Sequence, residues 1–240
     1  MKIFLITSNK YTHVCPINIH FLNKYWPNQE IVLLGYEEVS KLQNLPENVV
    51  RKNLGTQNDF GTSWTNGLIP FFNNIEDEYF IILLDDLIVL NEVDLHRINL
   101  LEEQFKSGDA DKAMIGGGLP LQSSTKINEE LLLFNQGVDY RCSLHPAIWT
   151  KEYFLKYLRP NLSPWEFEMH NNNAAKGDGY RVIANNYRYP AQQHPFSILN
   201  LYNKGKLMIN NRGDILDNQP SKRFFNKEDL IYIWEKLNAS

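Results

Sequence analysis

The sequence has only two cysteines, Cys15 and Cys142, and none of its apolar runs approaches the roughly 20 residues needed to cross a bilayer. The longest runs, such as residues 79–84, are far shorter. Residues 1–6 lead directly into polar residues, so they are too short for the apolar region of a signal peptide. These absences argue against a disulfide framework, a membrane span and a secretory leader. We expect a cytoplasmic protein, with peripheral association at a membrane surface as an open alternative.

Long blocks of like charge are also missing. The chain has 24 basic and 28 acidic residues, a formal net charge of −4. General nucleic-acid binding is therefore disfavoured, although the diphosphate of a nucleotide would need only a few well-placed cations. With 43% hydrophobic and 22% charged residues, the chain has the balance of a globular protein that buries a core. We expect residues 1–240 to form one domain and no nucleic-acid partner.

The first half of the chain alternates short apolar runs with helical periodicity. Strands are predicted at residues 2–6, 31–36, 49–54, 79–84 and 87–90, and helices at 17–25, 63–75 (broken or bent near Pro70) and 95–105. This alternation is typical of a parallel sheet with helices on both faces. We therefore predict an α/β fold in which residues 1–112 form a nucleotide-binding half.

From Ala113 the pattern changes to a mixed arrangement. Strands are predicted at residues 131–134, 143–149 and 180–184, and helices at 151–158, 163–173 and 227–237. No internal repeat is visible. Residues 113–240 are expected to complete the central sheet as a second, mixed half.

Two adjacent acids, Asp85 and Asp86, end the apolar run Tyr79–Leu84 and precede another apolar run. Ionised carboxylates at the edge of a core are costly unless they are hydrogen-bonded, paired with cations or bound to metal. The carboxyl ends of strands in an open α/β sheet are also where ligands bind. Mg²⁺ or Mn²⁺ suits such oxygen ligands, together with diphosphate oxygens and water. The alternative is that the two acids cap a turn or a neighbouring helix.

Three blocks occur in order along the chain: Leu-Leu-Asp-Asp at 83–86, Ser-Leu-His-Pro-Ala-Ile-Trp at 143–149, and Ser-Pro-Trp-Glu-Phe-Glu at 163–168. With residues 5–9 and 34–36, they resemble GT-A fold glycosyltransferases, particularly small bacterial and viral-type enzymes that use nucleotide sugars. The resemblance spans most of the chain. It implies a GT-A fold with a Rossmann-like nucleotide-sugar half, residues 1–112, and an acceptor-binding half, residues 113–240.

The resemblance also implies a metal, Mn²⁺ or Mg²⁺, held by an Asp-x-Asp-like motif. Here Asp85-Asp86 lacks the spaced acid of the full pattern, which leaves open whether the metal is essential. Some related enzymes supply a late histidine, which makes His194 the third candidate ligand. The alternative for His194 is an ordinary loop histidine.

Donor-binding candidates are polar or aromatic residues expected near the strand ends. They are Thr7, Ser8, Asn9, Gln57, Trp64, Asp85, Arg188 and Lys206. Those after the first strand face the crevice where α/β sheets bind ligands, although capping explains them equally well. Lys206 lies in a turn that resembles a segment closing over the donor diphosphate, and a solvated hairpin turn is the alternative.

Two carboxylates on the helix predicted at 163–173 are the catalytic candidates. Ser163-Pro-Trp-Glu166 has the spacing of a capping box, which by itself accounts for Glu166. The resemblance implies that a carboxylate at the start of an acceptor-side helix acts as general base. Glu166 is therefore the first candidate, and Glu168, on a different face of the helix, is the second. Trp149, Trp165 and His145 serve either a sugar or the core.

The function predicted is transfer of a hexose or pentose from a UDP- or GDP-sugar to a hydroxyl of a glycan or other acceptor, with inversion and metal assistance. A nucleotidyltransferase is the first alternative, but the segment after the first strand, residues 7–11, lacks the glycine of a phosphate-binding loop. A sugar- or nucleotide-binding module without turnover is the second.

Overall fold

The computed structural model describes residues 1–57, 64–116, 119, 121–186, 195–200, 202–203, 206–207 and 227–238. Its strands are β1 (Ile3–Ile6), β2 (Ile31–Gly35), β3 (Val49–Asn53), β4 (Tyr79–Leu84), β5 (Leu87–Val89), β6 (Lys112–Met114), β7 (Ser124–Lys126), β8 (Leu131–Phe134), β9 (Ala147–Thr150), β10 (Val182–Asn185), β11 (Ile198–Asn200), β12 (Tyr202–Asn203) and β13 (Lys206–Leu207). Its α-helices are α1 (Cys15–Tyr25), α2 (Thr65–Asn74), α3 (Leu95–Lys106), α4 (Lys151–Tyr157), α5 (Pro164–Ala174) and α8 (Lys227–Asn238). Short 3₁₀ helices span Thr12–Val14, Glu37–Lys41 and Leu121–Ser123.

One large sheet runs through both halves of the chain in the order β3-β2-β1-β4-β9-β6-β10-β8-β7. The four strands β3, β2, β1 and β4 are all parallel, as the alternating pattern predicts. Strand β9 then enters antiparallel between β4 and β6, and β8 is antiparallel to β10. The sheet is therefore parallel in its first half and mixed in its second, which confirms the predicted α/β class.

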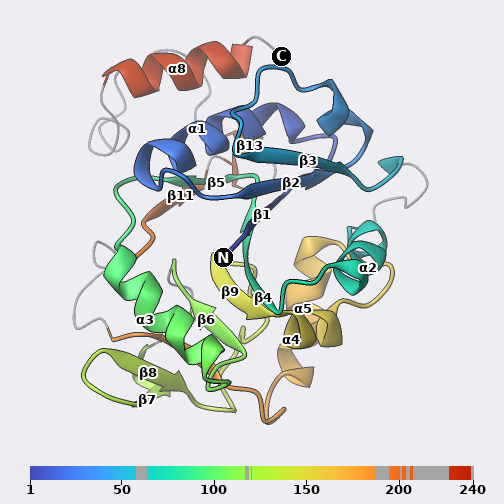
Figure 1. Cartoon of the computed structure of the whole chain (residues 1–240). Coiled ribbons are helices and arrows are strands. Elements are labelled where there is room, and N and C mark those ends of the chain that lie inside the picture. The colour runs from blue at the N-terminus through green and yellow to red at the C-terminus, as the bar shows by residue number, and fades with distance from the viewer. Residues whose placement is uncertain are drawn as a thin grey trace.

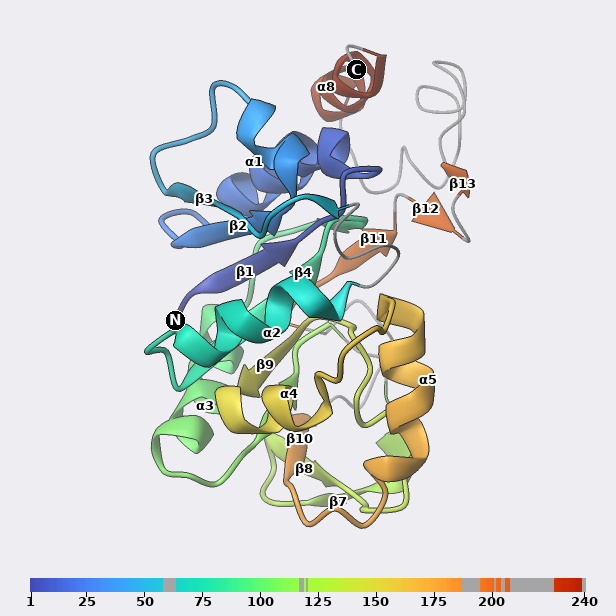
Figure 2. The ribbon, with the colours of Figure 1, turned by 90° about the vertical axis from the view of Figure 1, so that its right-hand side faces the viewer.

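Helices cover both faces of this sheet (Figures 1 and 2). Side chains alternate along each strand, so Phe4 and Ile6 of β1 belong to the core cluster that includes residues of α2, α4 and α5. Ile3 and Leu5 face the opposite cluster, formed with α1 and α3. Because both faces are covered, β1 is completely apolar and buried.

Two elements of the structure differ in their bounds or continuity from the prediction. The strand expected at 143–149 begins only at Ala147, because the preceding residues form a loop whose carbonyl oxygens accept hydrogen bonds from the buried Lys112. Helix α2 continues through Pro70 and is not broken there. A proline inside a helix removes one N–H from the helical ladder and crowds the carbonyl four residues before it, yet α2 remains helical on both sides of Pro70.

The remaining elements are small or peripheral. β11 pairs with β5, and β12 with β13. Helix α8 lies on α1 (Figure 1), where Lys24 Nζ contacts both carboxylate oxygens of the buried Asp229, at 2.6 and 2.7 Å. Within the part of the chain that the structure describes, none of the helices has the length and apolarity that a bilayer crossing requires.

Candidate active site

The carboxyl ends of β1, β2 and β4 meet at one edge of the sheet. The parallel register places Ile6 beside both Leu34 and Leu84, so Thr7 and the acid pair follow at the same level. Gly35 leaves room for the side chains of Val39 and Thr7 there, because a Cβ on it would clash with Val39 Cγ1 and lie 2.8 Å from Thr7 Cγ2. These strand ends form the floor of the site.

Asp85 points into the protein. It is 8% exposed, and its Oδ2 accepts a hydrogen bond of 2.6 Å from the Thr7 hydroxyl. Burial raises the pKa of Asp85 to about 7, against the opposing effect of the Thr7 bond. The turn after it is held from α1, where the buried Asn18 donates to the carbonyl of Leu87 at 2.5 Å. Asp85 therefore supports the strand end from inside.

The raised pKa of Asp85 has a measurable consequence for stability. The folded protein holds this proton more tightly than the unfolded chain, so stability falls as pH rises from 3.8 to about 7. We expect Asp85→Asn to lose this dependence and to be more stable than wild type at pH 8 by on the order of 2 kcal/mol, measured by denaturant unfolding without metal or nucleotide. The exposed-acid variant Glu92→Gln should follow the wild-type profile. Equal pH dependence in Asp85→Asn and wild type would contradict this account.

Asp86 borders two cavities that meet at its side chain, and Asp85 also lines the larger of them. The larger cavity has a volume of about 570 Å³ and the smaller about 210 Å³. The larger is lined by Ile6, Thr7, Ser8, Lys10, Tyr11, Tyr36, Gln57, Trp64, Leu84, Asp85, Asp86, Ser163 and Pro164. The smaller is lined by Leu84, Asp86, Leu87, Leu144, His145, Pro164, Trp165, Glu168 and Asn200. Leu84, Asp86 and Pro164 belong to both, so Asp86 lies where the two cavities join.

The wall of the larger cavity contains most of the predicted donor residues. Thr7, Ser8, Gln57 and Trp64 line it, whereas Asn9 braces the wall from behind. The backbone N–H of Asn9 donates to Gln57 Oε1 at 2.7 Å, and the Asn9 side chain accepts from the N–H of Glu38. The structure thus brings together the segments after β1, β2 and β3.

Sequence reasoning missed several residues of this wall. Lys10 and Tyr11 continue the polar loop after β1, and Tyr36 directly follows β2. Their positions in the sequence could have identified them, because each lies within a few residues of the carboxyl end of a strand in a parallel sheet, where ligands bind. Among the described residues that line this cavity, Lys10 has the only cationic side chain. Candidate phosphate contacts therefore include Lys10.

The structure separates the two catalytic candidates. Glu166 forms the capping box of α5, since its Oε2 accepts from the Ser163 N–H at 2.8 Å and its own N–H donates to Ser163 Oγ. These bonds lower the pKa of Glu166, and it is absent from the lining of both cavities. Glu168 lines the smaller cavity with Asp86. The capping interaction therefore occupies Glu166, whereas Glu168 borders the cavity beside Asp86.

Glu168 is oriented by the loop before β9. Its Oε1 accepts a hydrogen bond of 2.5 Å from the N–H of Leu144. The carbonyl of the same peptide unit, that of Ser143, accepts from Lys112 Nζ at 2.7 Å. Lys112 is fully buried, and its Nζ lies 3.9 Å from the centroid of the Trp149 ring. A buried lysine, whose pKa is lowered to about 7 by burial, and a carboxylate are thus linked through one peptide group, which fixes the position of Glu168.

Of the aromatic and histidine candidates, one is buried in the core and two line the smaller cavity. Trp149 is completely buried and belongs to the core. Trp165 is 68% exposed and lines the smaller cavity, so its ring is available to a ligand. His145, expected as a satisfied core residue, is instead exposed in that cavity. Chain order alone did not reveal that the loop of residues 143–146 faces α5.

The oxygen donors at the cavity junction fit a hard divalent cation. Among the described residues, no group of three or more His, Cys, Asp and Glu side chains could hold a metal ion. Asp86 supplies one carboxylate, and the adjacent Asp85, which also lines the larger cavity, supplies a second. Mg²⁺ and Mn²⁺ are commonly held by one or two carboxylates and completed by ligand phosphates and water. This donor set therefore fits a cation that arrives with a diphosphate.

The side chains of the three remaining predicted site residues are not described by the structure. Arg188 and His194 lie outside the described residues, and of Lys206 the structure describes only the backbone. That backbone pairs antiparallel with Asn203.

The strand order and the cavity at the strand ends define a GT-A-like fold. No protein-family model and no curated protein sequence matches the chain. Among solved structures, S. aureus TarS is 17% identical with a TM-score of 0.50, and the match covers 77% of this chain and 35% of TarS. The chain thus spans about a third of the TarS length.

Two further structures share the fold. S. aureus TarS 1-349 in complex with UDP is 15% identical with a TM-score of 0.51, over 77% of this chain and 57% of that chain. UDP-glucose pyrophosphorylase from Acinetobacter baumanii is 12% identical with a TM-score of 0.51, over 83% of this chain and 87% of that chain. At these identities the likeness shows the fold.

Proposed function

We propose that the protein is a glycosyltransferase that moves a sugar from a UDP- or GDP-sugar to a hydroxyl acceptor. One observation carries the proposal: two cavities of unequal size meet at Asp86. A transferase of this kind needs a nucleotide site and an acceptor site that share the reacting centre. A nucleotidyltransferase also needs room for a second substrate, but its nucleophile is an ionised phosphate oxygen, which needs no carboxylate to accept a proton. A simple binding module needs neither the second cavity nor the carboxylate.

The larger cavity is the proposed donor site. Its volume of about 570 Å³ lies within the range of about 300–1,000 Å³ usual for small-molecule sites. Tyr11, Tyr36 and Trp64 offer apolar surface for a base, and Lys10 offers a cation to the phosphates. The UDP complex of TarS 1-349, which shares the fold, supports a uridine nucleotide.

The smaller cavity is the proposed acceptor site. Glu168 accepts the proton of the acceptor hydroxyl as its oxygen attacks the anomeric carbon. The bond from that carbon to the diphosphate breaks, and the nucleoside diphosphate leaves with the bonding electrons. Attack from the side opposite the leaving group inverts the configuration. A divalent cation bound at Asp86, with Asp85 adjacent, would neutralise charge on the departing diphosphate.

A nucleotidyltransferase is the second candidate. The match to UDP-glucose pyrophosphorylase covers most of both chains, which favours it. The loop after β1 opposes it, because residues 7–11 contain no glycine and such enzymes need a backbone cradle for a triphosphate. The two candidates differ in the product that they release.

A thermal-shift screen followed by product analysis tests the proposal. We expect a UDP- or GDP-sugar to raise the melting temperature, Mn²⁺ to increase that shift, and turnover to release nucleoside diphosphate. Proton NMR of the product gives the anomeric configuration. Pyrophosphate release from a nucleoside triphosphate and a sugar phosphate would establish the second candidate. Binding with neither product, across acceptors, would leave only a binding module.

A further inference from the structure

Tyr140 has an unusual backbone. Four described residues other than glycine have left-handed φ angles: Asn28 (64°), Asn44 (55°), Asn161 (64°) and Tyr140 (62°). Asparagine tolerates this conformation, whereas a bulky residue such as tyrosine adopts it only at a cost in energy. Tyr140 is also 46% exposed, so burial of its ring in the core does not explain that cost. Strain of this kind tends to occur at ligand-binding sites.

The residue before Tyr140 is tied to α5. Asn172 Oδ1 accepts from the N–H of Tyr140 at 2.6 Å, and Asn172 Nδ2 donates to Asp139 Oδ1 at 2.9 Å. Lys176 forms an ion pair with Asp139, at 2.5 Å. One asparagine of α5 therefore holds two consecutive residues of this turn.

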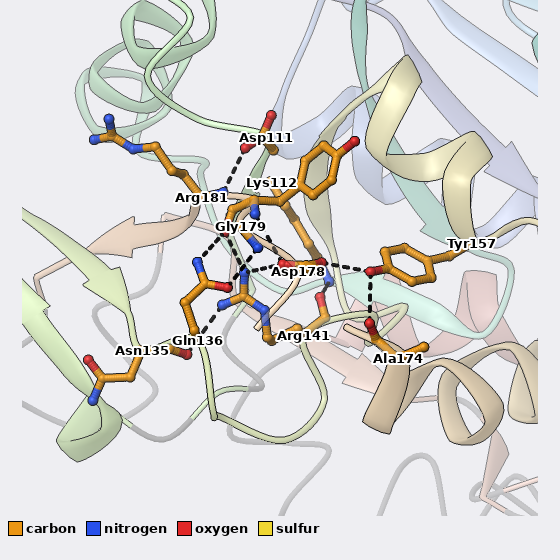
Figure 3. A network of polar contacts seen from close by, with 11 residues as sticks. Asp111, Lys112, Asn135, Gln136, Arg141, Tyr157, Ala174, Asp178, Gly179 and Arg181 are labelled. Atoms are coloured by element: carbon orange, nitrogen blue, oxygen red, sulfur yellow. Dashed lines mark hydrogen bonds and ion pairs between the residues drawn. The ribbon is translucent and has the colours of Figure 1, made fainter. Parts of the chain in front are cut away.

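The residue after Tyr140 is anchored more strongly. The guanidinium of Arg141 is fully buried and pairs with Asp178 at 3.2 Å, while it also donates to the carbonyls of Asn135 and Tyr180. Asp178 in turn accepts from the Tyr157 hydroxyl at 2.7 Å (Figure 3). Because both neighbours are fixed, the turn cannot relax, and the ring of Tyr140 remains at the surface.

Tyr140 contacts α5 at Asn172, which is the last residue of one face of this helix. Trp165, Glu168, Met169 and Asn172 are three or four positions apart and share that face, which we call the α5 face. Trp165 and Glu168 line the smaller cavity, Met169 is 40% exposed, and Asn172 contacts Tyr140. From Trp165 to Asn172 the helix rises by about 10 Å.

We propose that the α5 face and Tyr140 bind an acceptor glycan of two or more sugar residues, whose terminal residue occupies the smaller cavity. This inference rests on the proposed function. The smaller cavity, at about 210 Å³, is below the usual range of about 300–1,000 Å³ for a ligand site, so a longer acceptor must continue along the surface. The surface that continues from it is the α5 face.

The chemistry of this surface favours a glycan over a lipid or an apolar peptide. Between its exposed aromatic rings, Trp165 and Tyr140, lie the carboxylate of Glu168 and the amide of Asn172, with Met169 as the one further apolar side chain of the α5 face. Sugar rings present apolar C–H faces bordered by hydroxyls, which match aromatic planes with polar neighbours. A lipid or apolar peptide would be expected to need a continuous apolar patch.

The test measures binding of the full chain to an array of immobilised mono-, di- and longer oligosaccharides. We expect stronger binding to di- and longer oligosaccharides than to monosaccharides, and a loss of about tenfold in Tyr140→Gly and in Trp165→Ala. Tyr140→Gly should be at least as heat-stable as wild type, because glycine adopts a φ of 62° freely. A loss of binding without loss of stability thus separates ligand contact from folding. Leu95→Ala removes a different exposed apolar side chain and should bind like wild type.

The outcomes also separate this inference from the proposed function. Transfer to monosaccharides and longer acceptors with equal efficiency, unchanged in Tyr140→Gly, would overturn the inference and leave the glycosyltransferase standing. Glycan binding that depends on Tyr140, in a chain that transfers no sugar, would support the inference and refute the function. Binding to no oligosaccharide, or binding to vesicles that depends on Trp165 and Tyr140, would also overturn it.

Discussion

Asp86→Ala should abolish the extra thermal stability that Mn²⁺ gives the protein in the presence of a nucleotide sugar, and should lower transfer by about 100-fold or more. Asp86 is the carboxylate at the junction of the two cavities, whereas Asp85 is buried against Thr7. Without Asp86, a cation bound to the diphosphate would lose the protein ligand nearest to the reacting centre. The measurements are melting temperature with and without Mn²⁺, and the rate of nucleoside diphosphate release.

Two variants serve as controls for Asp86→Ala. Glu92→Ala removes an exposed acid outside the lining of either cavity and should keep both the Mn²⁺ effect and the activity. Asp86→Asn keeps the size of the side chain but loses the charge, so it should behave like Asp86→Ala. An undiminished Mn²⁺ shift in Asp86→Ala would place the metal elsewhere. Activity in all variants with EDTA present would show that transfer needs no metal.

The parallel half of the fold was predictable from sequence because its strands are short, continuous apolar runs. β1, β2 and β4 are buried on both faces, and each gives way to polar residues at its carboxyl end. That pattern placed Thr7 and Asp85-Asp86 at one edge. The antiparallel entry of β9 between β4 and β6 was not predictable, because local periodicity carries no information about which strands pair.

The different environments of Asp85 and Asp86 could not be predicted from the sequence either. Which of Asp85 and Asp86 turns inward depends on the Thr7 hydroxyl that receives it, a contact across 78 positions of the chain. Likewise, the loop that orients Glu168 is held by Lys112, a lysine inside a strand that no motif marks. Contacts of this kind arise from tertiary packing, and only the capping box of Glu166 could be read locally.

Glu168→Gln is expected to reduce transfer by about 10²–10⁴-fold while binding of the nucleotide sugar stays unchanged. The amide is close in size to the carboxylate, and its oxygen can still accept from the N–H of Leu144, but it cannot accept the proton of the acceptor. The loss should therefore appear in kcat and leave the melting shift caused by the donor intact. Initial rates at saturating donor and acceptor measure it.

Glu166→Gln is the matched control, two residues away on the same helix. Glutamine also serves in a capping box, so the start of α5 should persist with a loss of less than about 1 kcal/mol in stability and little change in rate. The reverse result, a large loss of rate in Glu166→Gln and a small one in Glu168→Gln, would restore Glu166 as the base. It would also mean that the capping box opens when the acceptor binds, because the Oε2 that accepts from Ser163 would have to turn toward the smaller cavity.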